Sequence, residues 1–239
     1  MQAMILAAGL GTRLKPLTDE TPKALIEING KTLLEIAIRN LIDHHFHKII
    51  INVHHHSEKV KQFIESNTFA ADILISDESD LLLDTGGGIK KALTYFDNSP
   101  VLVHNVDIIS NIDLNEFYNY HLSDDSLASL VVSKRVSSRY LLFNSDSVLC
   151  GWEDVKKSER IIVRKDHDYQ QLAFNGIHII NPELIKKFPN EKVFSVIKAY
   201  LNAASEEDIN AYVCNDIKWL DVGKLDSLSK AEELIKRIR

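Results

Sequence analysis

The amino-acid sequence predicts a three-layer α/β/α protein built around a mixed, mostly parallel sheet. In the first half of the chain, short apolar runs alternate with segments whose apolar residues recur at helical spacing, as in strand–helix–strand units. From about residue 127 most apolar runs are strand-like, which predicts a smaller β-rich portion. These observations indicate a Rossmann-like fold. No proline- or serine-rich linker interrupts the 239 residues, so we expect one domain over 1–239, with halves over 1–125 and 126–239.

Local patterns define the elements of the first half. Thr32 and Glu35 have the spacing of a capping box, and Asp113 with Glu116 repeats that spacing. Ser57 is expected to cap another helix. The helices are expected over 33–42, 57–64, 89–96 and 113–121. Apolar runs between them predict strands over 3–7, 48–53, 72–76 and 101–105.

The second half has more strands than helices. Asn181 before Pro182 predicts the start of a helix. Strands are expected over 127–133, 140–143, 160–163 and 177–180. The last helix is expected to bury Leu228, Ala231, Leu234, Ile235 and Ile238.

Ligands of this fold class bind at the carboxyl ends of the parallel strands. The predicted ends lie at 7–11, 53–56, 76–78 and 105–107. We expect these four segments to form a crevice.

Composition and charge exclude several functions. A net charge of −6 argues against a nucleic-acid binder with a broad basic face. Cys150 and Cys214 are too few and too far apart for a disulfide framework or a four-cysteine zinc site, which favours the reducing cytoplasm. Glycine and arginine interrupt the N-terminal apolar run, so neither a signal peptide nor a membrane span is expected.

The connection after the first strand carries the strongest signal of chemistry. No helical pattern follows the strand until Thr32, and long structureless connections are usually functional. Gly9 and Gly11 allow the backbone to approach a polyphosphate, while Arg13 and Lys23 supply positive charge. The segment is therefore predicted to bind an anion.

Two common phosphate-binding motifs do not fit this chain. A dinucleotide fingerprint needs a glycine where the chain has Leu14. A Walker A motif ending at Thr32 needs a glycine at Leu25. Asn29 and Gly30 are instead expected to form a turn.

The segment 6–23, called the glycine loop below, closely resembles the signature loop of the sugar-1-phosphate nucleotidyltransferases. The resemblance lies in the letters LAAGLGTRLKPLT and the TPK that follows. Later landmarks of that family recur in order, namely TGGG at 85–88, NVD at 105–107, NGI at 175–177 and WLDVG at 219–223. The short chain and the TGGG form are most similar to the N-acetylmuramate-1-phosphate uridylyltransferases of cell-wall recycling. Guanylyl or other nucleotidyl transfer to mannose or heptose 1-phosphate stays open as an alternative.

The resemblance implies a reaction and a metal. A phosphate oxygen of the sugar 1-phosphate attacks the α-phosphorus of a nucleoside triphosphate (NTP) and expels pyrophosphate. The nucleophile is already ionised, so the demand is charge neutralisation rather than a general base. Arg13, Lys23 and Asp107 are the implied catalytic residues. By resemblance Asp107 and Asp221 hold Mg²⁺, or Mn²⁺ in its place.

The resemblance also implies the substrate contacts. The half over 1–125 is expected to bind the nucleotide, and the half over 126–239 the sugar. Nucleotide contacts are expected from Leu6, Ala7, Ala8, Gly9, Gly11, Thr12, Arg13, Lys23, Thr85, Gly86 and Gly87. Sugar contacts are expected from Asn105, Glu153, Asn175 and Gly176.

The chain departs from the family pattern at two places. It lacks the Glu-Lys-Pro element of many members, for which Glu153 and the pair Arg164-Lys165 are the nearest candidates. Val106 stands where most members have glycine before the metal aspartate. A β-branched residue suits a strand, so we still expect the Asp107 backbone conformation to be attainable.

Other readings are less favoured. Two histidine clusters, at 44–47 and 54–56, suggest zinc, but a helix end and a strand end explain them better, with His54 or His55 lining the crevice. Cytidylyl transfer to a non-sugar phosphate such as phosphocholine stays open. A non-catalytic nucleotide-sugar sensor would be expected to lose the charged residues that this chain retains. We expect a monomer or homodimer without nucleic-acid or membrane partners.

Overall fold

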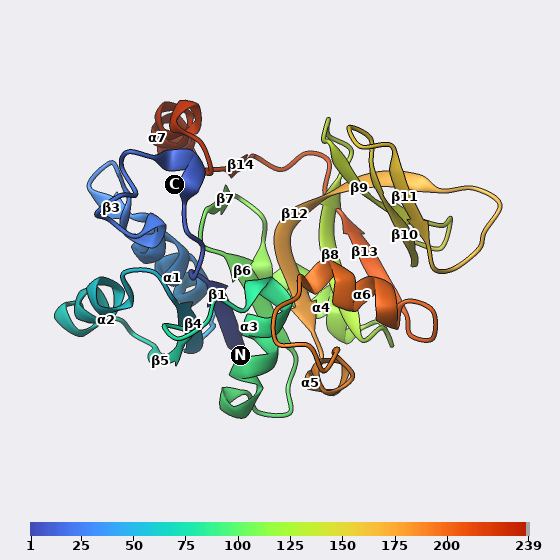
Figure 1. The fold of residues 1–239 in the computed structure, drawn as a ribbon, viewed down its shortest axis with the longest axis horizontal. Coiled ribbons are helices and arrows are strands. Elements are labelled where there is room, and N and C mark those ends of the chain that lie inside the picture. The colour runs from blue at the N-terminus through green and yellow to red at the C-terminus, as the bar shows by residue number, and fades with distance from the viewer. Residues whose placement is uncertain (238–239) are drawn as a thin grey trace.

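The computed structural model describes residues 1–237, in which helices cover both faces of a ten-stranded sheet (Figure 1). The strands of this sheet are β1 (Gln2–Leu6), β4 (Lys48–Val53), β5 (Asp72–Asp77), β6 (Val101–Asn105), β8 (Ala128–Ser133), β9 (Arg139–Phe143), β10 (Leu149–Asp154), β11 (Glu159–Ile162), β12 (Gln170–Ile180) and β13 (Ile209–Val213). Their order is β11-β10-β9-β12-β6-β1-β4-β5, and β8 pairs with both β12 and β13. The predicted three-layer α/β/α fold is confirmed.

The parallel part of the sheet follows the sequence prediction closely. β1 lies between β4 and β6 and is parallel to both, and β5 continues the parallel pairing beyond β4. The bounds of β4 and β6 are those predicted, β1 is shifted by one residue at both ends, and β5 is one residue longer at its end. Strands buried on both faces read as continuous apolar runs, which explains this agreement.

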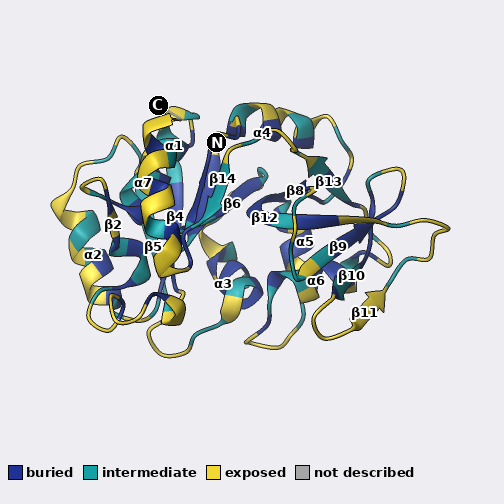
Figure 2. Cartoon of the chain, turned by 90° about the horizontal axis from the view of Figure 1, so that it is seen from above, coloured by how far each residue is buried: buried dark blue, intermediate teal, exposed yellow. Residues whose placement is uncertain are grey.

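The helices form two layers (Figure 2). α1 (Leu33–Asp43), α2 (Ser57–Ser66), α4 (Leu114–Leu122) and α7 (Leu228–Arg237) share one apolar core with Ile5 of β1. α3 (Asp84–Ala92), α5 (Pro182–Lys186) and α6 (Val196–Ala203) share a second core with Met4. Met4 and Ile5 point to opposite faces because successive strand residues alternate. Within residues 1–237, no helix is long and apolar enough to span a bilayer.

Two of the predicted helix caps are confirmed. The hydroxyl of Thr32 accepts a 3.0 Å hydrogen bond from the amide of Glu35. The carboxylate of Asp113 accepts from the amides of Asn115 and Glu116. Each cap satisfies a donor that the first turn of a helix leaves unpaired.

The predicted cap at Ser57 is wrong by one residue. His56 occupies the cap position of α2, in the left-handed conformation with φ 54°. Ser57 is the first helical residue, and its hydroxyl lies 2.9 Å from that of Ser79 instead of capping the helix. A contact with a distant part of the chain thus replaced the local cap.

The second half contains elements that were not predicted. β10, β13 and α6 are absent from the sequence-based assignment, and β12 begins at Gln170 rather than at residue 177. Pairing with neighbouring strands, which local sequence does not show, determines β10, β13 and the start of β12. α6 packs its apolar residues into the core that contains Met4. α7 is confirmed with Ala231 and Ile235 buried, whereas Ile238 lies outside the described residues.

The connection between β1 and α1 is more ordered than the sequence suggests. It contains two 3₁₀ turns, η1 (Thr12–Leu14) and η2 (Lys23–Leu25), and a hairpin of β2 (Glu27–Ile28) with β3 (Lys31–Thr32). Asn29 and Gly30 form the predicted turn, with φ values of 52° and 74°. Further 3₁₀ turns are η3 (Leu93–Tyr95) and η4 (Leu225–Ser227).

A separate two-stranded ladder ties the C-terminal region to the centre. β7 (Ile108–Ser110) pairs antiparallel with β14 (Trp219–Asp221), and Asp221 lies opposite Ile108. In Figure 1 the chain from β13 crosses to this ladder before it enters α7. The ladder therefore places the end of β14 beside the segment that follows β6.

Candidate active site

Asp107 and Asp221, the aspartates expected to act as a pair, lie side by side at the carboxyl edge of the parallel strands. Asp107 directly precedes β7, and Asp221 ends β14. The amide of Val222 donates a 2.8 Å hydrogen bond to the carbonyl of Asp107. Backbone pairing between distant parts of the chain therefore brings the two carboxylates together.

Two cations flank these aspartates. Lys23 Nζ forms an ion pair with Asp107 Oδ2, and both side chains are largely buried. Arg13 Nη2 lies 3.9 Å from Asp221 Oδ2, and these side chains are partly exposed. The four residues that the resemblance assigns to phosphate and metal thus meet in one place.

Asp221 has an oxygen that no described residue satisfies. Its carboxyl pKa is raised by burial and by the neighbouring charge of Asp107, against the opposing charges of Lys23 and Arg13. Its buried Oδ1 atom has no hydrogen-bond partner within residues 1–237. Hard divalent cations prefer carboxylate oxygens, so this pair of residues fits Mg²⁺.

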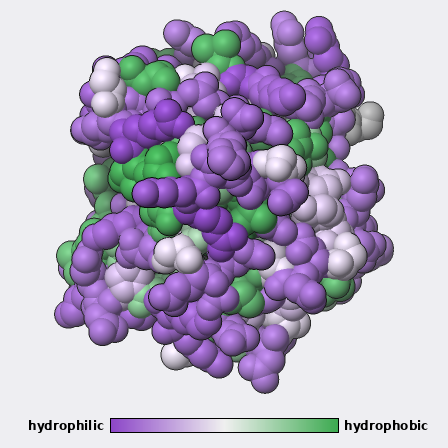
Figure 3. Space-filling view, turned by 90° about the vertical axis from the view of Figure 1, so that its right-hand side faces the viewer, coloured by the Kyte–Doolittle hydropathy of each residue, from purple (hydrophilic) through white to green (hydrophobic). Residues whose placement is uncertain are grey.

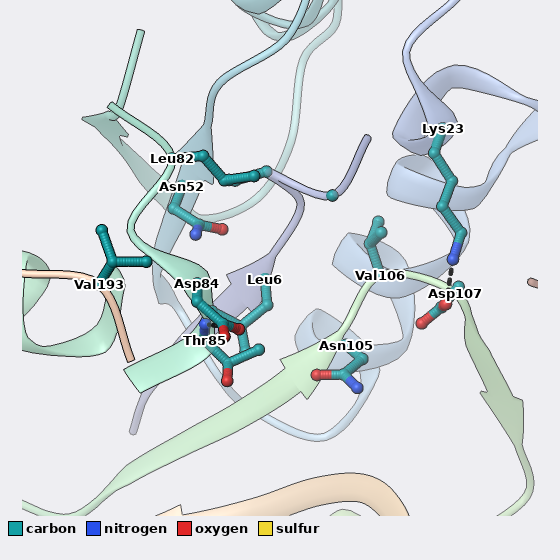
Figure 4. A pocket seen from close by; sticks show the side chains of 12 residues that line it. Leu6, Lys23, Asn52, Leu82, Asp84, Thr85, Asn105, Val106, Asp107 and Val193 are labelled. Atoms are coloured by element: carbon teal, nitrogen blue, oxygen red, sulfur yellow. Dashed lines mark hydrogen bonds and ion pairs between the residues drawn. The ribbon is translucent and has the colours of Figure 1, made fainter. Parts of the chain in front are cut away.

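A cavity of about 440 Å³ opens beside the aspartates. Figure 4 shows Lys23 reaching Asp107 while Asn105 and Val106 lie between Asp107 and the remaining wall. The other lining residues are Leu6, Ala8, Gly9, Asn52, Leu82, Asp84, Thr85 and Val193. Seven residues predicted to bind nucleotide, sugar or metal line it, namely Leu6, Ala8, Gly9, Lys23, Thr85, Asn105 and Asp107.

A second, larger cavity of about 660 Å³ lies between α6 and the strands β9–β12. Its wall is mostly apolar, with Leu141, Trp152, Phe174, Ile197 and Leu201, and it includes no carboxylate. Figure 3 views the molecule from the β9–β11 end, where apolar side chains are exposed on a mostly polar surface. The smaller cavity, with its adjoining aspartates and cations, is therefore the candidate active site.

The other residues of the glycine loop lie outside the cavity lining and form hydrogen bonds within the protein. The amide of Ala7 donates to Asn52 Oδ1 at 2.7 Å. Gly11 has φ 63°, and its carbonyl accepts a 2.8 Å hydrogen bond from the hydroxyl of Thr18. Thr12 begins η1. Ala7, Gly11, Thr12 and the partly exposed Arg13 do not line the cavity itself, and their contact with nucleotide stays a prediction.

Gly86 and Gly87 lie inside α3 rather than before it, and both are buried against the segment 192–194. Their amides both donate to the carbonyl of Phe194. A Cβ at Gly87 would lie 2.2 Å from the carbonyl oxygen of Lys192. Gly86 and Gly87 therefore allow a close approach of the chain's own backbone, and their contact with nucleotide, which the resemblance implies, stays a prediction.

The residues assigned to the sugar gather where β6 meets β12. Gly176 has φ 77° at an irregularity of β12, and a Cβ there would lie 2.8 Å from Asn105 Nδ2. Asn175 is fully buried next to it. The structure thus brings Asn175 and Gly176 next to Asn105, which lines the cavity. Asn175 and Gly176 do not line it, and the sugar contacts of all three residues stay predictions.

The candidates for the missing Glu-Lys-Pro element lie apart from the cavity lining. Glu153 lies opposite Tyr140 of β9 and accepts a hydrogen bond from Gln171. Arg164 pairs with Asp208 at 2.6 Å, so it braces the end of the β-rich portion instead of the site. The sugar contact of Glu153 stays a prediction.

Sequence reasoning missed Arg135, which lies beside Trp219 of β14, the strand that ends at Asp221. Its guanidinium carbon lies 4.1 Å from the ring centroid of Trp219. Its Nε atom donates to Asn175 Oδ1 at 3.1 Å, and Nη2 donates to the carbonyl of Phe174 at 2.7 Å. Burial lowers the pKa of Arg135, and the charge of Asp221 opposes this shift. Local sequence after β8 carries no signal for this placement.

Sequence reasoning also missed Asn52, which forms a buried polar pair with Glu78 of the expected crevice segment 76–78. Asn52 Nδ2 donates to Glu78 Oε1 at 2.8 Å, and the amide of Leu83 donates to Glu78 Oε2 at 3.1 Å. Burial raises the pKa of Glu78. Together with the contact of Ala7, these bonds connect the glycine loop to the segment before α3. The signal was an asparagine inside the apolar run of β4.

The histidine clusters have local contacts. His54 Nδ1 lies 2.7 Å from the carbonyl of Glu78, and His56 caps α2. Neither His54 nor His55 lines the candidate cavity. Within residues 1–237, no group of three or more His, Cys, Asp or Glu side chains is arranged to hold a metal ion.

A family model described as nucleotidyl transferase matches residues 2–237. The chain is 31% identical to the N-acetylmuramate alpha-1-phosphate uridylyltransferase of Caulobacter vibrioides, over 96% of this chain and 95% of that protein. It is 29% identical to the D-glycero-alpha-D-manno-heptose 1-phosphate guanylyltransferase of Campylobacter jejuni, over 82% of each chain.

The fold recurs in solved structures. HddC from Yersinia pseudotuberculosis, crystallised with GMP-PN, superposes with a TM-score of 0.78. The two chains are 24% identical, and the match covers 98% of this chain and 99% of that one. This likeness supports the Rossmann-like assignment of the fold.

Proposed function

This chain belongs to the nucleotidyl transferase family, and from that premise we propose that it transfers a nucleotidyl group from an NTP to a sugar 1-phosphate. The observation that carries this proposal is the meeting of Asp107 and Asp221 with Lys23 and Arg13 beside one cavity. The products are a nucleotide sugar and pyrophosphate.

Charge organises the proposed reaction. A phosphate oxygen of the sugar 1-phosphate forms a bond to the α-phosphorus, and the bond from that phosphorus to the pyrophosphate oxygen breaks. Lys23 and Arg13 are positioned to neutralise the phosphates of the NTP. No proton has to leave the nucleophile, so the reaction needs no general base. The described residues of the cavity wall agree with this, because their titratable side chains are carboxylates and one lysine, without a histidine.

Asp107 and Asp221 would hold Mg²⁺, and Mn²⁺ is the expected substitute. When bound, the cation supplies positive charge that draws the two anionic substrates together and offsets charge on the leaving group. Lys23 balances the charge of Asp107 in the protein alone and is close enough to the cavity to serve a phosphate as well.

Uridylyl transfer to N-acetylmuramate 1-phosphate is our first choice for the specific reaction. The support is the 31% identity to the Caulobacter vibrioides enzyme over nearly the full length of both chains. Guanylyl transfer to a heptose 1-phosphate is the second choice, supported by the 29% identity to the Campylobacter jejuni enzyme. We further propose that the protein works in the cytoplasm as a monomer or homodimer, without nucleic-acid or membrane partners.

A substrate matrix tests the proposal. UTP, GTP, CTP, dTTP and ATP are each combined with the 1-phosphates of N-acetylmuramate, mannose, heptose and glucose, and with phosphocholine, and pyrophosphate release is measured. Turnover with UTP and N-acetylmuramate 1-phosphate is expected and should be lost in Asp107→Ala. Turnover with phosphocholine alone, or nucleotide-sugar binding without pyrophosphate release, would refute sugar transfer.

A further inference from the structure

Arg135 is held rigidly and has no acidic partner. Within residues 1–237, its guanidinium forms no ion pair with a carboxylate, although it is half-buried. Its contacts are the ring of Trp219, the carbonyl of Phe174 and the side-chain oxygen of Asn175. Trp219 is itself fixed, because its indole N–H donates to the carbonyl of Asn175 at 2.8 Å. A cation is thus pre-oriented without a counter-charge.

The guanidinium has donors to spare. Five N–H groups project from it, and the two hydrogen bonds to Asn175 and Phe174 engage only Nε and one hydrogen of Nη2. Both hydrogens of Nη1 and one of Nη2 are left. A planar fork of this kind suits an anion with several oxygens, such as a phosphate.

A neighbouring donor also lacks an acceptor. Asn175 is fully buried, and its Nδ2 atom has no hydrogen-bond partner among the described residues. Its Oδ1 atom accepts from both Arg135 and Ser133, so the orientation of the amide is determined. Unpaired N–H donors are therefore found on Arg135 and on Asn175, and Gly176 connects Asn175 to Asn105 on the cavity wall.

The position of Arg135 selects among the phosphates of the proposed reaction. Arg13 approaches Asp221 from the glycine loop, whereas Arg135, which follows β8, stacks on Trp219 at the other end of β14. Each end of β14 therefore has an arginine beside it. The glycine-loop side already has Arg13 and Lys23 for the NTP, and the β-rich side has Arg135. We propose that Arg135 binds the phosphate group of the sugar 1-phosphate, the nucleophile of the transfer.

This inference rests on the proposed function, and it explains how a chain without the Glu-Lys-Pro element supplies a cation to the sugar substrate. A bound phosphate so placed would lie next to the aspartate pair, where its oxygen must reach the α-phosphorus. The rigid stack on Trp219 would limit its rotation.

Steady-state kinetics of Arg135→Met and Arg135→Lys test the assignment. Methionine keeps an unbranched side chain over Trp219 but removes the charge, and lysine keeps the charge but not the fork. We expect KM for the sugar 1-phosphate to rise about 10- to 100-fold in the methionine variant and less in the lysine variant. KM for the NTP should stay within about 2-fold of wild type, because Arg13 and Lys23 are untouched.

Arg160→Met is the matched control. Arg160 is an exposed arginine of the same β-rich portion that also lies over an aromatic ring, 5.3 Å from the centroid of Tyr169. This variant removes one charge and one arginine–aromatic contact without approaching the aspartates. Its KM for both substrates should equal that of wild type.

Two further measurements separate the possible results. Inorganic phosphate, titrated calorimetrically into protein saturated with NTP and Mg²⁺, should bind to wild type and Arg160→Met but not to Arg135→Met. This readout does not depend on turnover. Substrates with and without a sugar carboxylate should lose the same factor in Arg135→Met. A loss confined to carboxylate-bearing sugars, an equal rise in KM for NTP, or unchanged phosphate binding would overturn the assignment. If wild type turns over no sugar 1-phosphate, the proposed function fails instead.

Discussion

The amide of Val222 donates a 2.8 Å hydrogen bond to the carbonyl of Asp107, and this bond joins the segments that carry both acidic residues of the site. Because Asp221 directly precedes Val222, its carboxyl is held next to Asp107 in a partly buried setting. Like charges held together in this way are unfavourable unless a cation separates them. The site is therefore built at a cost in stability that a cation can offset.

Asp221→Asn should exchange activity for stability. The change removes a charge whose carboxyl pKa is raised by burial and by Asp107, so the metal-free protein should gain about 1 kcal/mol in free energy of unfolding. Pyrophosphate release should fall about 100-fold or more, because a proposed cation ligand is lost. Thermal unfolding with EDTA and a turnover assay measure the two effects.

Asp168→Asn is the control for that exchange. Asp168 is exposed in the loop between β11 and β12, so its replacement should change neither unfolding nor turnover. Should Asp221→Asn keep most of its turnover, the cation assignment would be wrong. A lower melting temperature without metal would contradict the electrostatic reasoning.

Alanine substitutions at Gly9 and Gly87 should distinguish a glycine that faces the ligand from one that packs against the protein. Gly9 lines the cavity, and a Cβ there would meet nothing within 4 Å. Gly9→Ala should therefore leave the free energy of unfolding unchanged while raising KM for NTP about 10-fold, if phosphates approach this backbone. Urea unfolding and steady-state kinetics make the comparison.

Gly87→Ala should behave in the opposite way. A Cβ at Gly87 would lie 2.2 Å from the carbonyl oxygen of Lys192, so α3 or the segment 192–194 must move. We expect a loss of about 1–3 kcal/mol in free energy of unfolding. Unchanged stability in Gly87→Ala, or unchanged KM in Gly9→Ala, would show that the two glycines have other roles.

The parallel half of the fold could be predicted because each strand is buried on both faces and each helix repeats its own apolar pattern. β4 and β6 are examples whose bounds agree with the prediction at both ends. β10 could not be predicted because its residues form neither a continuous apolar run nor a strict alternation. β13 could not be predicted because it is short and its partner, β8, lies far away in sequence. Ser57 shows the same limit, since Ser79 was needed to explain it.

The site divides along similar lines. Residues that carry family motifs, such as Lys23 and Asp107, could be named before the fold was known. Arg135 could not be named, because its partners come from distant segments. The irregularity of β12 places Phe174 and Asn175 beside it, and β14 brings Trp219 back to it. Asn52 offered a weak signal, a polar residue within a buried strand, whose meaning depends on Glu78, directly after the next strand, β5.

Asn52→Asp should make stability strongly dependent on pH. The substitution keeps the shape and the acceptor for the Ala7 amide but places a carboxyl against the buried Glu78. The pKa of Glu78 is already raised by burial, and a second acid should raise it further. A raised acid pKa stabilises the fold below the unfolded pKa, and this contribution is lost as pH rises through the folded value.

Urea unfolding from pH 5 to pH 8 should therefore show Asn52→Asp losing about 2 kcal/mol relative to wild type as pH rises. Asn67→Asp is a suitable control, because Asn67 is exposed at the end of α2. Parallel pH profiles for Asn52→Asp and wild type would show that the two side chains do not share a proton.

Two buried histidines in adjacent strands should destabilise the fold in acid. Burial lowers the pKa of His104 to about 4 and that of His178 to about 3. The unfolded value is higher, so the stability that each neutral ring contributes is complete above about pH 6.5 and is lost as pH falls toward the folded pKa. Between pH 7.5 and 5.5 each histidine should cost about 1.4 kcal/mol in free energy of unfolding.

His178→Gln isolates one of these contributions. His178 Nδ1 lies 2.9 Å from the hydroxyl of Tyr200, and a glutamine amide oxygen is a neutral acceptor for that hydroxyl. The variant should be less stable than wild type at pH 7.5, because packing is disturbed, yet its loss between pH 7.5 and 5.5 should be smaller by about 1.4 kcal/mol. His45→Gln, at an exposed turn, should leave the pH profile unchanged. Identical slopes in wild type and His178→Gln would mean that His178 takes up a proton in the folded protein over this range, as it does when unfolded.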